Sequence, residues 1–150
     1  MSSVPERDLS AREKVGAKAL AAPKPKRRRA KRRILVVDDN TSAAESLATL
    51  LEVMGNETCQ AHDGLEAIDA AMKFLPDVVV LDISLPKLDG CDAARVIRER
   101  LGGSAPYLIA LSGWERDGDE RLRQAGFDAY LTKPVEMDTL RSLLASRLNE

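Results

Sequence analysis

The chain has 150 residues, the length of one ordinary domain, and 44% of them are hydrophobic, which is enough to bury a core. No apolar run approaches the roughly 20 residues of a transmembrane helix, and the N-terminus lacks the apolar centre of a signal peptide. We therefore exclude membrane insertion and expect a cytoplasmic protein. Two cysteines, Cys59 and Cys91, are too few for a disulfide framework, and we expect both to be buried or half-buried hydrophobes.

The net charge of −1 hides two segments of opposite charge. Residues 1–33 hold 12 Lys and Arg against 3 Asp and Glu, whereas residues 34–150 hold 11 against 21. The first segment also contains three prolines and a basic run from Lys24 to Arg33. Because such a segment cannot bury enough apolar surface to offset the entropy lost on ordering, we predict a disordered tail over residues 1–33 and one folded domain over residues 34–150.

The folded region alternates short apolar runs with segments of helical periodicity, about 3.6 residues per turn. Strands are predicted at Ile34–Val37, Glu57–Ala61, Asp77–Asp82, Tyr107–Leu111 and Ala129–Leu131. Helices are predicted at Ser42–Met54, Gly64–Leu75, Cys91–Leu101, Glu115–Ala125 and Glu136–Leu148. The spacing predicts two inner helix faces, one formed by Ala43, Leu47, Leu50, Leu51 and Met54, and one by Leu65, Ile68, Ala71 and Met72.

Strands that are apolar on both faces and alternate with helices are typical of a parallel sheet covered on both sides. Because crossovers are right-handed, the doubly wound order 2-1-3-4-5 is the simplest arrangement of five strands. Ligands of such α/β folds bind beyond the carboxyl ends of the strands, at the switch point between strands one and three.

Polar residues stand at four of the five predicted strand ends. They are Asp38 and Asp39 after the first strand, Asp82 in the third, Ser112-Gly113 after the fourth, and Thr132-Lys133-Pro134 after the fifth. Three carboxylates in one cleft repel one another unless a cation neutralises them. A hard divalent ion such as Mg²⁺ accepts carboxylate and phosphoryl oxygens, and the lysine and hydroxyl add donors. These residues predict a phosphoryl site without a bound nucleotide.

The same residues also have structural interpretations. Asp38, Asp39 or Asn40 can cap the first helix, and a serine at a strand end is commonly a turn residue. Their joint placement at four strand ends favours a functional site. Nucleotide and flavin binding are disfavoured because the loop from Asp38 to Thr41 lacks the glycines that let a backbone cradle phosphate.

The chain resembles the receiver domains of two-component response regulators, which have a CheY-like (βα)₅ fold of the flavodoxin-like type. The matching segments lie within residues 34–150 and agree in order, spacing and residue type. They are Ile34–Asn40, Asp63-Gly64, Pro76–Asp82, Leu85-Pro86, Leu88–Gly90, Ile109–Gly113, Ala125–Tyr130 and Leu131–Pro134.

The resemblance implies a role for each site residue. Asp82 would accept the phosphoryl group, and Lys133 would pair with it, the peptide before Pro134 being cis. Mg²⁺ or Mn²⁺ would be bound by Asp39, Asp82 and the backbone carbonyl of Ser84, with Asp38 acting through water. Ser112 and the Gly113 N–H would bind the acquired phosphoryl oxygens, and Tyr130 would turn inward as the second part of a switch. Without the resemblance, Tyr130 would be interpreted as a half-buried strand residue.

Two positions would affect the lifetime of the phosphoryl group in such a protein. They are Ser84, two residues after the acceptor, and Trp114, two residues after the hydroxyl. Trp114 presents an apolar indole where a small or acidic residue could position a hydrolytic water, so we expect it to shield the phosphoryl group. The alternative is that Trp114 points outward as a partner contact.

The resemblance implies a signalling protein and not an enzyme, with self-phosphotransfer and slow autodephosphorylation as its only chemistry. It would receive its phosphoryl group from a histidine kinase or histidine phosphotransfer protein and signal to a downstream protein through the last two helices and the fifth strand, where a homodimer could also form. Because one helix follows Lys133-Pro134, we expect a stand-alone regulator; the alternatives are a phosphate sink and the detached receiver of a hybrid kinase. An aspartate-nucleophile phosphatase is disfavoured because Ser84 stands where that class needs a second acid.

The basic run from Lys24 to Arg33 has two interpretations. Clustered Lys and Arg gain affinity for nucleic acid, or for the domain's own acidic face, by releasing counterions, although no nucleic-acid recognition fold accompanies the run. The run could equally be a solvated leader or follow from a start codon placed too far upstream. His62, the only histidine, stands in a predicted turn, which argues against a phosphohistidine carrier.

Overall fold

The computed structural model describes residues 31–113 and 120–148, and side chains as far as residue 146. Five parallel strands form one sheet in the order β2-β1-β3-β4-β5, as predicted. The strands are β1 (Arg33–Val37), β2 (Glu57–Ala61), β3 (Val78–Asp82), β4 (Tyr107–Ser112) and β5 (Ala129–Thr132). Each strand end lies within one residue of its prediction.

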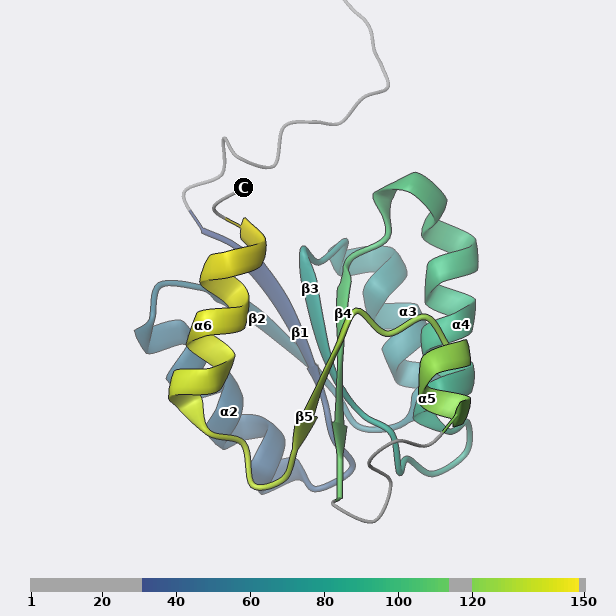
Figure 1. Ribbon diagram of the computed structural model, residues 1–150, viewed down its shortest axis with the longest axis horizontal. Helices are drawn as coiled ribbons and strands as arrows, with labels where there is room; N and C mark the ends of the chain where they lie inside the picture. The colour runs from purple at the N-terminus through teal and green to yellow at the C-terminus, as the bar shows by residue number, and fades with distance from the viewer. Residues whose placement is uncertain (1–30, 114–119, 149–150) are drawn as a thin grey trace, which may run out of the picture. The chain divides into compact units, whose positions relative to one another are not determined.

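Helices cover both faces of this sheet (Figure 1). They are α2 (Thr41–Val53), α3 (Gly64–Phe74), α4 (Gly90–Leu101), α5 (Glu120–Gln124) and α6 (Met137–Leu148), and a 3₁₀ turn, η3 (Gly102–Ser104), follows α4. Helices α2 and α6 lie on one face, and α3, α4 and α5 lie on the other. The predicted helix from Glu115 lies partly outside the described residues, which omit 114–119. None of the described helices has both the length and the apolar character needed to span a bilayer.

Two apolar cores lie on the two faces of the sheet, because successive side chains of a strand point in opposite directions. Leu35 and Val37 of β1 pack on the side of α3 and α4, whereas Ile34 and Val36 pack on the side of α2 and α6. Every residue of β3 is buried, which accounts for its continuous apolar run. Both cysteines contribute to the core on the α3 side, Cys91 buried and Cys59 half-buried, as predicted.

The inner faces of α2 and α3 differ from their predictions. The residues of α2 that are fully buried against the sheet are Ala44, Ala48 and Leu51. Ala43 is exposed, and Leu50 is 46% exposed. On α3, Leu65 is 57% exposed, although Ala71 is buried as predicted. The predictions were wrong for Ala43, Leu50 and Leu65 only. Leu51 is buried as predicted, and the other predicted residues, Leu47, Met54, Ile68 and Met72, are half-buried against the two cores. Small alanines let these helices pack closely on the sheet.

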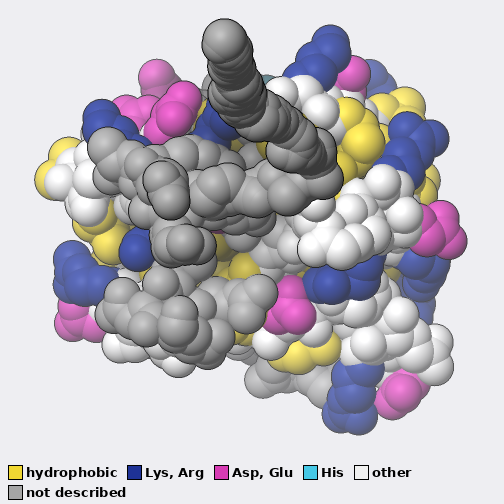
Figure 2. Space-filling view, turned by 90° about the horizontal axis from the view of Figure 1, so that it is seen from above, with side chains coloured by type: hydrophobic (Ala, Val, Ile, Leu, Met, Phe, Trp, Pro, Cys, Tyr) yellow, Lys and Arg dark blue, Asp and Glu magenta, His cyan; other side chains and the backbone are white. Residues whose placement is uncertain are grey.

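The basic run contributes its last residues to the fold. Arg33 begins β1, its N–H donates to Asp77 Oδ2 at 2.8 Å, and its guanidinium lies 4.4 Å from the centre of the Phe74 ring. The carbonyl of Arg32 accepts from the Glu57 N–H at 2.8 Å. These contacts lie at the amino-terminal edge of the sheet, the side from which Figure 2 is seen, where basic and acidic side chains are interspersed over the described surface. Residues 1–30 of the predicted tail lie outside the described residues.

The loop between β3 and α4 packs against the first turn of α3. Asp63 caps α3, with its Oδ1 accepting from the Glu66 N–H at 2.8 Å. A Cβ atom added to the next residue, Gly64, would overlap the backbone carbonyl oxygen of Leu88. Glycine at this position therefore allows the loop to approach the helix. Both residues of the Asp63-Gly64 pair thus have a structural role, Asp63 as the cap of α3 and Gly64 as the point of close approach.

A Gly64→Ala substitution is expected to lower the free energy of unfolding by about 2–3 kcal/mol, because rigid backbone surrounds the added methyl group. Urea denaturation measures the loss. The matched control is Gly103→Ala, where the added Cβ meets open space and a change within about 0.5 kcal/mol is expected. Equal stabilities of the two variants would contradict the packing explanation.

Candidate functional site

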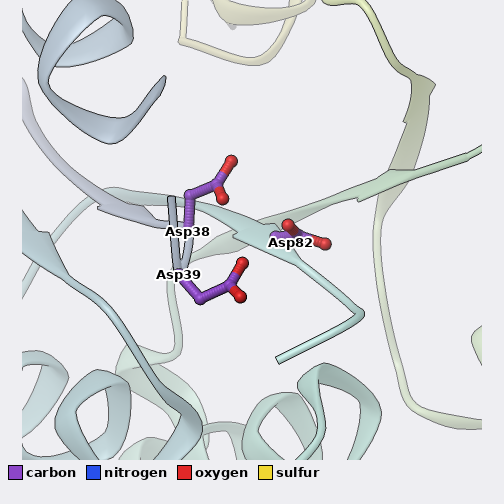
Figure 3. Close-up of side chains that lie close together, drawn as sticks. All are labelled: Asp38, Asp39 and Asp82. Carbon is purple, nitrogen blue, oxygen red and sulfur yellow. The ribbon is translucent and has the colours of Figure 1, made fainter. Parts of the chain in front are cut away.

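Three carboxylates lie together at the carboxyl edge of the sheet (Figure 3). One oxygen from each of Asp38, Asp39 and Asp82 lies within 4.8 Å of the others. Asp38 and Asp82 are buried, and Asp39 is exposed. The proximity follows from the sheet, because β1 and β3 are neighbours whose parallel register places Val37 beside Leu81, one residue before Asp38 and Asp82.

Lys133 reaches the same carboxylates from the end of β5. Its Nζ lies 2.7 Å from Asp82 Oδ2 and 3.5 Å from Asp38 Oδ2. The Lys133 N–H donates to the Ser112 carbonyl at 2.9 Å, which ties the lysine backbone to the end of β4. The Lys133–Pro134 peptide is cis, as predicted. The ends of four strands therefore contribute to one site.

The site is short of positive charge. Burial raises the pKa of Asp82, against the opposing effect of the hydrogen bonds from Lys133 and the Ser84 N–H, and the charge of Asp38 acts in the same direction as burial. Burial acts to lower the pKa of Lys133, but the attraction of Asp82 and Asp38 outweighs it and leaves that pKa raised. Over the part of the chain that the structure describes, one ammonium group pairs with two of the three carboxylates, a cluster that a further cation would stabilise.

The cap of α2 involves Asn40 and Asp38 but not Asp39. Asn40 is the N-cap, with its side chain accepting from the Ala43 N–H at 3.1 Å. Asp38 Oδ1 accepts from the Asn40 N–H at 3.0 Å and so supports the turn. Within the described part of the chain, no hydrogen bond or ion pair holds the side chain of Asp39. Helix capping, the alternative role considered for these residues, therefore does not explain Asp39.

The remaining predicted site residues are Ser84, Ser112, Tyr130 and Trp114. Ser84 is exposed, and its N–H donates to Asp82 Oδ1 at 2.9 Å. Ser112 is buried at the end of β4, one residue beyond Leu111, the neighbour of Asp82 in the sheet. Tyr130 lies on the edge strand β5 and is 42% exposed, with its hydroxyl 3.4 Å from the Leu122 carbonyl oxygen. Trp114 lies outside the described residues.

The donor set fits a hard divalent cation. Asp38, Asp39 and Asp82 offer carboxylate oxygens close enough to share one ion, and no cysteine or histidine of residues 31–113 and 120–148 joins this cluster. Oxygen ligands of this kind suit Mg²⁺ or Mn²⁺.

Two features beside the site escaped the sequence analysis. Helix α2 turns an apolar seam of Ala43, Leu47, Leu50 and Met54 partly towards solvent. Lys87, in the loop after β3, has a positive φ of 69°. The seam's spacing is visible in the sequence, but the spacing alone does not distinguish an inner face from an outer one. A lysine between Pro86 and Leu88 carries no signal that predicts its backbone conformation.

Five parallel strands in this order, with a carboxylate cluster at the switch point, define a doubly wound α/β domain, a class of fold whose ligands bind at the carboxyl edge. Residues 34–145 match the family described as the response regulator receiver domain, and the chain belongs to this family. Among similar proteins is the polar-differentiation response regulator DivK of Brucella anthropi, 32% identical over 116 residues that span 74% of this chain and 94% of DivK.

Solved structures of receiver domains share the fold. The receiver domain of the sensor histidine kinase PA1611 from Pseudomonas aeruginosa, solved with a magnesium ion coordinated in its active-site cleft, has a TM-score of 0.73 and 32% identity, over 81% of this chain and 100% of that one. The receiver domain of the Saccharomyces cerevisiae regulator Ssk1, crystallised with the histidine phosphotransfer protein Ypd1, has a TM-score of 0.70 and 25% identity, over 77% and 87%. The chain is thus a CheY-like receiver domain of two-component signalling.

Magnesium is expected to raise the thermal unfolding midpoint, because it binds the gathered carboxylates of the folded chain and not the dispersed ones of the unfolded chain. At a hundredfold excess over the dissociation constant, the stabilisation is about 2.7 kcal/mol. A chelator reverses the shift, and Asp39→Asn removes most of it. In the control variant Asp69→Asn, which lies on an exposed position of α3, the shift remains. An equal shift in Asp39→Asn and the wild type would contradict binding at this cluster.

Proposed function

We propose that the chain accepts a phosphoryl group on Asp82 from a phosphohistidine of a histidine kinase or histidine phosphotransfer protein. The observation that carries the proposal is the placement of Asp82 Oδ2 within 2.7 Å of Lys133 Nζ, beside Asp38 and Asp39. A carboxylate oxygen of Asp82 attacks the phosphorus, an O–P bond forms, and the N–P bond to histidine breaks, with its electron pair returning to the imidazole. The product is an aspartyl phosphate.

The residues around Asp82 orient it for this transfer. Its two oxygens are held separately, Oδ1 by the Ser84 N–H at 2.9 Å and Oδ2 by Lys133 at 2.7 Å. Asp39, Asp82 and the Ser84 carbonyl would hold Mg²⁺, with Asp38 acting through water. When bound, the ion neutralises charge on the phosphoryl oxygens, which is the main requirement of phosphoryl transfer besides positioning. Lys133 supplies the second positive charge.

The acquired phosphoryl group then changes the balance between two conformations. The Ser112 hydroxyl and the Gly113 N–H bind phosphoryl oxygens, and the movement of Ser112 leaves room for Tyr130 to turn inward. The outward position of Tyr130, with 42% of its surface exposed, is consistent with a resting state. The output is contact with a downstream protein, or with a second copy of the chain, through α5, β5 and α6.

Two relatives support different contexts for this switch. The match with this chain covers 94% of DivK, so that relative consists almost wholly of a receiver domain. This likeness favours a regulator that acts without an attached output domain. The PA1611 receiver belongs to a sensor histidine kinase, which supports the alternative of a phosphate sink or a receiver that serves a hybrid kinase. Self-phosphotransfer and slow autodephosphorylation are the only chemistry that either context requires.

Intact mass measured after treatment with acetyl phosphate and Mg²⁺ tests the acceptor. The wild-type chain is expected to gain the mass of one phosphoryl group, and Asp82→Asn, or the wild type with a chelator, is expected to gain none. Modification of Asp82→Asn at the wild-type rate would rule out Asp82 as the acceptor.

The same measurement followed over time tests the shielding proposed for Trp114, because Trp114→Glu should then lose the phosphoryl group faster.

The apolar seam of α2, in which Ala43 and Leu50 are exposed and Leu47 and Met54 are half-buried against the core, supports a helical protein as the phosphoryl donor. Ala43, Leu47, Leu50 and Met54 recur at alternating spacings of four and three residues, the pattern by which one helix packs along another. Helix α2 begins at Thr41, two residues after Asp39, so a partner lying on the seam stands beside the acceptor. We propose that the phosphohistidine protein docks here.

Leu50→Asp is expected to slow transfer from a phosphorylated histidine kinase by about tenfold, equivalent to about 1.4 kcal/mol. Phosphorylation by acetyl phosphate should remain unchanged, because a small donor needs no docking surface. The control is Leu75→Asp, which introduces the same charge at a residue of similar exposure, 50% against 46%, after α3. Equal slowing by both variants, or none by Leu50→Asp, would contradict docking on α2.

A further inference from the structure

The loop between β3 and α4 contains a turn that residues with side chains rarely adopt. Lys87 has a φ of 69°, and the Leu88 N–H donates to the Pro86 carbonyl at 2.8 Å, which closes a three-residue turn around Lys87. A positive φ costs free energy for any residue with a Cβ, whereas glycine adopts it freely. Such a conformation persists where the surrounding contacts hold it in place.

The side chain of Lys87 makes one of these contacts. Its Nζ lies 3.4 Å from Asp63 Oδ2. The other oxygen of Asp63 accepts from the Glu66 N–H at 2.8 Å, so the first turn of α3 fixes the carboxylate. The hydrogen bond from Glu66 lowers the pKa of Asp63, and Lys87 acts in the same direction against the effect of burial. Asp63 is therefore a fixed negative charge to which the loop is attached.

The same loop begins at the phosphoacceptor. The Ser84 N–H donates to Asp82 Oδ1 at 2.9 Å, and the Gly90 N–H donates to the Ile83 carbonyl at 3.0 Å, so both ends of the loop meet the end of β3. Between these ends, the loop lies against Gly64 at the Leu88 carbonyl and against Asp63 at Lys87. The contacts with α3 thus restrain the loop at the third and fourth residues after Ser84.

We propose that Lys87 and Asp63 are positioning residues for the metal site. Their ion pair holds the turn from Pro86 to Leu88, and this turn keeps the backbone of Ser84 oriented so that its carbonyl can bind Mg²⁺. The inference rests on the proposed function, in which that carbonyl is a metal ligand. Neither side chain is required to touch the ion or the phosphoryl group.

Charge alone and positioning predict opposite results for Lys87. Removing a positive charge leaves its surroundings more negative, so on charge alone Lys87→Met would tighten the binding of a divalent cation. If Lys87 holds the loop, the same variant weakens binding. Asp63→Asn keeps an oxygen that can cap α3 but removes the charge that attracts Lys87, so positioning predicts that both variants weaken binding.

Titration calorimetry with Mg²⁺ on the full chain measures this effect. Lys87→Met and Asp63→Asn are each expected to weaken binding about three- to tenfold, less than the loss of a group that directly supports a metal ligand. The double variant should bind Mg²⁺ no more weakly than whichever single variant binds it more weakly, since the two residues act through one contact.

Lys73 and Asp69 provide matched controls. They form an ion pair of 3.1 Å on the exposed side of α3, so Lys73→Met and Asp69→Asn repeat the same charge changes away from the loop. Both variants are expected to bind Mg²⁺ within about twofold of the wild type, because exposed charges are screened.

Lys87→Gly separates positioning from stability. Glycine adopts the positive φ without strain but cannot reach Asp63. Its thermal unfolding midpoint is expected within about 2 °C of the wild type, because the exposed end of the pair at Lys87 is screened by solvent and glycine relieves the strain of the positive φ. Its Mg²⁺ binding should nevertheless weaken as in Lys87→Met, a combination that a purely structural role would not produce.

Binding of Mg²⁺ by Lys87→Met as tight as, or tighter than, that of the wild type would overturn the inference while leaving the proposed function intact. A wild-type chain that binds no Mg²⁺ would overturn both. Amide hydrogen exchange without metal gives a second readout. Exchange over residues 84–88 should be faster in Lys87→Met and Asp63→Asn than in Lys73→Met, and unchanged exchange in both would also overturn the inference.

Discussion

The attraction between the Lys133 ammonium and the carboxylates of Asp82 and Asp38 is the interaction on which the site depends. Buried carboxylates at this distance repel one another, and burial disfavours their charged forms. Lys133 offsets part of this repulsion through contacts of 2.7 and 3.5 Å. In the proposed function, the remaining negative charge attracts the cation that neutralises the incoming phosphoryl group.

The sheet can hold such a cluster because its centre is rigid. Strands β1 and β3 are buried on both sides, so the backbone that carries Asp38 and Asp82 is fixed by packing from two cores. Lys133 comes from β5, beyond β4, and its long side chain spans the intervening strand. Rigid strand ends place the carboxylates, while loops and the edge strand carry the groups that we propose respond to the phosphoryl group.

The loops at this edge show how neighbouring helices support the site. The start of α3 supplies both a glycine that admits the β3–α4 loop and a carboxylate that attracts Lys87. Helix α2 is capped by Asn40, so the side chain of Asp39 takes no part in the cap. Two residue pairs of the family resemblance therefore divide their roles in the same way. In Asp39-Asn40 and Asp63-Gly64, the second residue shapes the backbone and the aspartate carries a charge.

Apolar runs and helical periodicity are local properties of the chain, so the order of the elements, the ends of the strands and the polar residues at those ends could be predicted from the amino-acid sequence. It did not determine which side of α2 faces the sheet, since Ala48 is buried and Leu50 is partly exposed. Nor did it determine the backbone of Lys87 or its contact with Asp63. Those features depend on how closely segments far apart in the sequence pack in the folded chain. Small side chains and a glycine let their backbones approach each other, and a hydrophobicity pattern contains no information about such distances.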